Sequence, residues 1–225
     1  RPLRVRLVNM TAFRSRSLDA QEAGLWSLHE DYPDLIPPGE VWMSDAADPT
    51  DRRYFLANAQ AIYDGLACGL SYDDATDYGL AVERSERERD TLGGEGKQLP
   101  THADIARMGV YVRPWLTLER DGERVAVWLV KGRKLREIFK TDAFSGGHAF
   151  VYPWIPEPEV WIEADKRPSE RAFDVLHELT ERQSMKHEKL GYDDAHNRAA
   201  RVEFAARQEY KRTGKLPFTE TADGP

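Results

Sequence analysis

Three side chains in the last quarter of the chain have the types and spacing of a metal site. His177 and Glu181 are four residues apart in a segment with helical pattern, so their side chains lie on one helix face about one turn apart. His196 follows on the next predicted helix, across a tight turn, where it would supply a third ligand. Two histidines and one carboxylate leave a position open for water, which is typical of catalytic zinc. The pattern therefore predicts a divalent metal, zinc by preference.

Other residues are candidates for proton transfer, for support of the metal ligands and for substrate binding. Glu178 is rotated by about 100° from the first ligand around the helix axis, so we expect it to act as general base on an activated water. His148 follows two glycines, whose flexibility would let it approach as acid, oxyanion donor or fourth ligand. Glu203 shares a helix face with His196 and is a supporting or alternative ligand. Arg182 is a candidate for binding an anionic substrate, although such arginines usually form ion pairs.

The segment HELTERQSMKH, which begins at His177, resembles the motif helix of the zincin metallopeptidases. In that family a His-Glu-x-x-His helix supplies two metal ligands and a general-base glutamate. The family's motif helix commonly follows an edge strand, as EVWI at 159–162 precedes this helix. The chain departs from the motif because Glu181 stands where the second histidine would be. The resemblance implies that His177, Glu181 and His196 are ligands and Glu178 the base; peptidase activity does not follow from it.

A similar segment occurs twice in the chain. IPPGEVW at 36–42 and IPEPEVW at 155–161 are identical at five of seven positions. LSYDDA at 70–75 and LGYDDA at 190–195 follow in the same order and at nearly the same separation. Two rare strings in one order indicate an internal duplication. Each copy has the pattern of a strand, a helix, a tight turn and a second helix.

The first copy lacks every candidate metal ligand. In one register, Asn58, Ala59 and Ile62 stand at the positions of His177, Glu178 and Glu181. In a register shifted by one residue, Ala57, Asn58 and Ala61 stand there instead. Thr76 stands at the position of His196. Glu203 has Glu83 as its counterpart and His148 has His29, which favours structural roles for those two positions. We therefore expect one specialised site, in the second copy.

The remaining patterns predict an α+β fold. Asp121-Gly122 between two apolar segments predicts a β-hairpin, and LRVRLV near the start predicts a half-buried strand. We expect a small, largely antiparallel sheet with two duplicated strand-helix-turn-helix units packed on it. We expect residues 1–225 to form a single, internally duplicated domain. Its expected parts are the degenerate copy at 29–90, a hairpin-containing connector at 91–147, the copy with the candidate site at 148–212 and a tail at 213–225.

The composition of the chain indicates which partners and which cellular compartment suit the protein. The net charge of −7, from 39 acidic and 32 basic residues, disfavours broad nucleic-acid binding, which only the basic stretch at 113–136 supports. No apolar run is long enough to cross a membrane. Cys68 is the single cysteine, so no internal disulfide or thiolate metal cluster is expected. A reducing, cytoplasmic location is the natural interpretation.

Three functions fit these observations. The first is a metal-dependent hydrolase that uses the His/Glu/His site and Glu178, with a substrate that the sequence does not reveal. The second is a duplicated module without enzymatic activity, whose acidic helices contact an unknown protein partner. The third is a phosphate-ester hydrolase in which Glu178, Glu181 and Glu203 bind magnesium.

Overall fold

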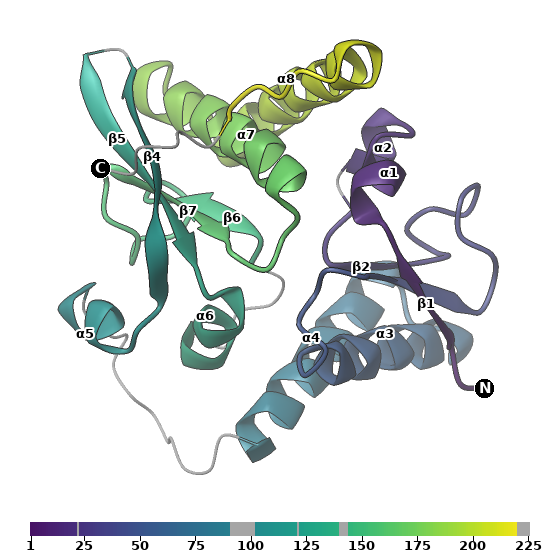
Figure 1. The fold of residues 1–225 in the computed structure, drawn as a ribbon. Coiled ribbons are helices and arrows are strands. Elements are labelled where there is room, and N and C mark those ends of the chain that lie inside the picture. The colour runs from purple at the N-terminus through teal and green to yellow at the C-terminus, as the bar shows by residue number, and fades with distance from the viewer. Residues whose placement is uncertain (22, 91–101, 121, 140–143, 220–225) are drawn as a thin grey trace. The chain divides into compact units, whose positions relative to one another are not determined.

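The chain folds into two compact units, each assembled from three segments (Figure 1). This computed structural model describes residues 1–21, 23–90, 102–120, 122–139 and 144–219. Unit 1 consists of Arg1–Phe13, Ala23–Lys97 and Arg133–Ala143, and unit 2 of Arg14–Glu22, Gln98–Gly132 and Phe144–Pro225. None of the helices in the described ranges combines the length and apolar character needed to cross a membrane.

Unit 1 is built on a three-stranded sheet. Its strands, in spatial order, are β1 (Arg4–Val8), β3 (Glu40–Ser44) and β2 (Trp26–Leu28). The two EVW strings thus begin strands as the sequence predicted. Helix α3 (Arg52–Ala67) packs against β2 and β3, and α4 (Tyr72–Asp90) packs against α3. Apolar side chains of β3 and α3, among them Val41, Phe55 and Ile62, form the core.

Unit 2 is built on a four-stranded sheet. Its strands, in spatial order, are β4 (Tyr111–Arg120), β5 (Glu123–Val130), β7 (Glu159–Glu163) and β6 (Gly146–His148). Helix α7 (Pro168–His187) packs against β6 and β7, and α8 (Tyr192–Thr213) packs against α7 (Figure 1). The remaining helices in the described part of the chain are α1 (Met10–Arg14), α2 (Leu18–Gln21), α5 (His102–Arg107) and α6 (Gly132–Phe139).

The α+β class and the hairpin are as predicted, but the sheets differ from the expectation. β4 and β5 pair antiparallel, with Gly122 at a positive φ of 76° in the turn. Instead of a single, largely antiparallel sheet, the described residues form two mixed sheets, because β1 pairs parallel with β3 and β5 pairs parallel with β7. The hairpin is therefore part of the second sheet and not a separate connector. Strand β1 is also more exposed than the half-buried strand expected there.

The tail also contributes to the core, contrary to its weak apolar pattern. Leu216 and Phe218 pack against the core of unit 2. The predicted glycine-rich loop at 91–100 lies outside the described residues.

Each unit contains a buried arginine contributed by the opposite half of the sequence. In unit 2, Arg14 Nη1 lies 3.1 Å from Glu170 Oε2, at the start of α7. In unit 1, Arg136 Nε lies 2.8 Å from Asp51 Oδ2, next to the start of α3. Both arginines are buried. Each helical pair is therefore held at its start by a residue distant in sequence.

Candidate metal centre

Local sequence signals form the two helices that carry the candidate ligands. Proline at the first position of α7, Pro168, has no backbone N–H to satisfy there. Helix α8 has acidic residues in its first turn and Lys211 and Arg212 in its last, which suits the helix dipole. It ends at Gly214, whose φ of 71° and backbone N–H bond to the Tyr210 carbonyl form a left-handed cap.

The interface between α7 and α8 combines buried polar residues with small ones. Helix α7 buries His177, Glu181 and Ser184, which recur at helical spacing. Helix α8 buries the small residues Ala195, Ala199 and Ala200. Small side chains let two helices approach closely, so residues of α8 can reach polar groups of α7.

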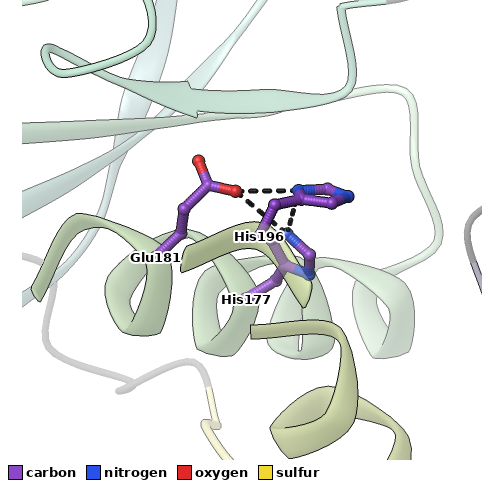
Figure 2. Close-up of side chains that lie close together, drawn as sticks. All are labelled: His177, Glu181 and His196. Atoms are coloured by element: carbon purple, nitrogen blue, oxygen red, sulfur yellow. Dashed lines mark hydrogen bonds and ion pairs between the residues drawn. The ribbon is translucent and has the colours of Figure 1, made fainter. Parts of the chain in front are cut away.

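Three donor atoms converge at this interface (Figure 2). His177 Nε2 lies 3.1 Å from His196 Nδ1 and 3.5 Å from Glu181 Oε2, and His196 Nδ1 lies 2.8 Å from the same oxygen. Around a zinc ion with bonds of 2.0–2.1 Å, neighbouring tetrahedral ligands are about 3.3 Å apart. The three observed separations lie on both sides of this value, so the sequence-predicted ligands are close enough together to hold one ion.

A carboxylate orients the ring of the first histidine. His177 Nδ1 lies 2.9 Å from Glu203 Oε2, and Glu203 Oε1 accepts from Arg207 Nε at 2.8 Å. Burial raises the pKa of Glu203, but the bond with His177 and the charge of Arg207 outweigh it and lower the pKa overall. An ionised carboxylate only accepts, so Nδ1 carries the hydrogen and Nε2 faces Glu181 and His196.

The electrostatics of the cluster favour a positive charge between the ligands. Burial lowers the pKa of His177, but its hydrogen bonds with Glu181 and Glu203 outweigh burial and raise that pKa to about 10. Burial raises the pKa of Glu181, but hydrogen bonds with His148, His177 and His196 lower it overall. A proton or a metal ion can supply the positive charge that these carboxylates favour.

Glu178 lies beside the cluster, as its position on the helix predicted. Ligand atoms of Glu178, Glu181 and His148 lie within 4.8 Å of one another. Burial raises the pKa of Glu178 to about 8, the charge of His177 opposes this, and that of Glu181 adds to it. A carboxyl group with a pKa near the working pH is suited to accept and return a proton.

The two glycines before His148 leave space for neighbouring side chains. The sequence suggested instead that they make the backbone flexible. A Cβ on Gly146 would lie 2.8 Å from Glu178 Oε1, and one on Gly147 would lie 2.5 Å from Cδ2 of Tyr152. Both glycines lie in strand β6, at the edge of the sheet. They allow Glu178 and the Tyr152 ring to pack directly on the backbone of this strand.

Arg182 is engaged by other protein groups. Its Nη2 donates to Glu123 Oε2 at 3.1 Å and to the backbone carbonyl of Glu157 at 3.1 Å, and the residue is buried. An ion pair is the ordinary role of such an arginine, and substrate binding by Arg182 stays a prediction.

Among the described residues of unit 1, the corresponding interface has no group of possible metal ligands. Asn58 Nδ2 donates to Glu83 Oε2 at 2.8 Å, as His177 does to Glu203, which supports the register that aligns Asn58 with His177. In that register Ile62 takes the place of Glu181, and it is buried in the core. Among the described residues, the two groups with the geometry to hold a metal are both in unit 2.

Sequence reasoning missed a buried polar cluster near Glu178. Lys166 Nζ donates to Asp174 Oδ2 at 2.7 Å and to Ser145 Oγ at 2.8 Å. In the register of the repeat, the first copy has Ala47 and Phe55 at the positions of Lys166 and Asp174. The internal comparison therefore contained a signal for these two residues. Arg14, which lies 3.4 Å from Asp174, had no such signal near the site.

Comparisons with protein-family models, with curated proteins and with solved structures gave no match to this chain. The interpretation of the centre therefore depends on its own residues and geometry.

Proposed function

We propose that this protein is a metal-dependent hydrolase whose ion, zinc by preference, is held by His177, Glu181 and His196. The observation that carries the proposal is the convergence of three donor atoms at separations of 2.8, 3.1 and 3.5 Å. The donor set of two imidazoles and one carboxylate is the one that catalytic zinc uses, and the zincin-like arrangement of the motif helix is consistent with it.

A zinc ion bound there would lower the pKa of a coordinated water toward neutrality. We expect Glu178 to accept the proton of that water, because a carboxyl oxygen of Glu178 lies within 4.8 Å of Glu181 and burial raises the pKa of Glu178 to about 8. Glu203 keeps the His177 ring oriented through Nδ1, and Arg207 keeps Glu203 ionised. The class of substrate stays open.

The alternative with three magnesium-binding carboxylates is less favourable. It requires free oxygens on Glu178, Glu181 and Glu203. Both oxygens of Glu203 are already engaged, one by His177 and the other by Arg207. Two of the three Glu181 contacts are also with the histidines of the zinc site. This arrangement favours a mixed nitrogen and oxygen donor set.

We also propose that the two units descend from one duplicated strand-helix-turn-helix segment. In each unit, a central strand has one parallel and one antiparallel neighbour among corresponding strands. Arg87 contacts Glu83 and Asp51 in unit 1, as Arg207 contacts Glu203 and Glu170 in unit 2. The shared contacts form the scaffold, and the metal ligands belong to the second copy alone.

Metal content by mass spectrometry tests the function. Protein purified without a histidine tag should contain, or take up, about one equivalent of zinc, and His177→Ala and His196→Ala should lose it. His187→Ala is the matched control, because this exposed histidine ends the same helix and takes no part in the cluster.

If the native protein neither contains metal nor binds added zinc, the hydrolase proposal is wrong. A duplicated interaction module would then be the better interpretation. If zinc is bound and the His177 and His196 variants keep it, the ion lies elsewhere and the assigned ligands are wrong.

A further inference from the structure

The structure assigns His148 the role of a positioning residue that holds Glu181 in place for the metal, an inference that rests on the proposed metal centre. Through Nε2 it contacts one oxygen of Glu181, at 3.1 Å from Oε1. The other oxygen, Oε2, is the one that faces His177 and His196. His148 thus acts on the ion through Glu181 and touches neither the ion nor the substrate.

The hydrogen bonds of the ring define its tautomer. The backbone N–H of Phe150 donates to His148 Nδ1, with 3.3 Å between the nitrogens. Nδ1 therefore accepts, and in a neutral imidazole the hydrogen is then on Nε2. This Nε2–H points to Glu181 Oε1 and donates to it. A nitrogen that carries a hydrogen has no lone pair for an ion, so His148 does not serve as a fourth ligand in this arrangement.

The burial of His148 argues against direct contact with a substrate. The residue is 0% exposed in strand β6, in contact with Glu181 and with its ring centroid 6.0 Å from that of Phe150. A general acid has to reach the leaving group, directly or through one water. A hydrogen bond that orients a ligand needs no such access. Residues of this kind commonly change metal affinity by 10–100-fold when they are replaced.

The first copy provides an internal comparison. His29 occupies the position of His148 in the repeat, directly after the corresponding strand β2, but its Nδ1 contacts the backbone carbonyl of Ile36 at 2.6 Å. In the register of the repeat Ile62 stands where Glu181 does, so His29 has no carboxylate to orient at that position. A histidine is thus common to both units, and only in unit 2 is it joined to a candidate ligand.

The test measures zinc affinity by competition with a chromophoric chelator, for the native protein, His148→Ala and His148→Gln. Glutamine keeps an N–H donor at a similar reach from the backbone, whereas alanine has none. We expect His148→Ala to bind zinc 10–100-fold more weakly, with one equivalent still bound at saturation. We expect His148→Gln to recover most of the affinity. His29→Gln, the matched control in unit 1, should bind zinc like the native protein.

The visible spectrum of the cobalt-substituted protein supplies a second readout. Loss of the donor to Glu181 should alter the cobalt spectrum of His148→Ala and leave that of His148→Gln close to native. A spectrum and an affinity unchanged in His148→Ala would overturn the assignment. Equal losses in both variants would mean that the ring is needed only for packing, which also overturns it.

Stoichiometry separates the remaining outcomes. Two equivalents in the native protein and one in His148→Ala would make His148 a ligand of a second ion, with Glu178 and Glu181, and would contradict the positioning role. A native protein that binds no zinc would overturn the proposed function itself, and this assignment with it. One equivalent with unchanged affinity in His148→Ala would overturn the positioning role alone.

Discussion

Replacing the buried arginine of unit 2 tests whether a distant segment supports the metal centre. Arg14 pairs with Glu170 at 3.1 Å and with Asp174 at 3.4 Å, and the side chain is only 7% exposed. Breaking a buried ion pair by removing one partner costs about 3–5 kcal/mol. Arg207 and Lys166 also contact these two acids, so we expect the lower end of that range for Arg14→Met.

The matched control is Arg136→Met, which removes the corresponding arginine from unit 1. This side chain is 1% exposed and pairs with Asp51, which Arg87 also contacts. Its loss should destabilise α3 and α4 by a similar amount. Because the proposed zinc ligands are all in unit 2, Arg136→Met should leave zinc affinity near the native value.

Hydrogen exchange followed by mass spectrometry resolves the two units by their peptides. A loss of about 3 kcal/mol corresponds to exchange about a hundredfold faster in the core of the affected unit. In Arg14→Met this acceleration should appear in peptides of α7 and α8, and in Arg136→Met in peptides of α3 and α4. Zinc affinity should also fall about tenfold in Arg14→Met. Arg14 pairs with Glu170, and Glu170 also contacts Arg207. Arg207 in turn holds Glu203, the carboxylate that orients His177.

The reasoning would be refuted if both variants accelerated exchange in the same unit, or if both lowered zinc affinity equally. It would also be refuted if Arg14→Met left the exchange of α7 and α8 unchanged.

Two further changes test the scaffold of unit 2. Burial raises the pKa of Glu170, but the charges of Arg14 and Arg207 outweigh it and lower the pKa to about 2. The ionised Glu170 therefore contributes about 3 kcal/mol to the free energy of unfolding above its unfolded pKa of 4.5. This contribution is lost as the pH falls from about 5 toward 2. Glu170→Gln should flatten the dependence of the unfolding free energy on pH in this range, measured by urea unfolding, and an unchanged slope would contradict the ion pairing. Gly147→Ala should cost about 1–3 kcal/mol in the same assay because its Cβ would lie 2.5 Å from the Tyr152 ring. Gly191→Ala is the control for Gly147→Ala, because a Cβ on Gly191 would meet no atom within 4 Å. If both substitutions lowered the free energy of unfolding equally, the contact between residue 147 and Tyr152 would be unimportant.

Local sequence patterns were sufficient for the four long helices α3, α4, α7 and α8 and for the pair of candidate ligands on α7. His177 and Glu181 share a face because helical geometry places residues four apart on one side. The strands at the two EVW strings, the hairpin and the C-terminal ends of the long helices also follow from local signals. The approach of His196 could be inferred because a tight turn returns the chain antiparallel beside α7.

Strand pairing could not be inferred in the same way. Parallel pairing of β1 with β3 and of β5 with β7 joins segments that no tight turn connects. The expectation of one largely antiparallel sheet failed for this reason. The alignment of the two copies was also ambiguous by one position in α3, and the Asn58–Glu83 contact supplied the evidence for one register.

The sequence by itself determined which residue types could bind a metal and which helix face carries them, because both depend on chemistry and helical period within a few residues. Only the tertiary structure decided the environment of those residues. It brought His148 from strand β6 to Glu181, Glu203 to His177, and Arg14 from the other end of the chain to Glu170. These contacts depend on how sheets and helices pack over long separations, and local patterns do not encode which buried charge meets which partner.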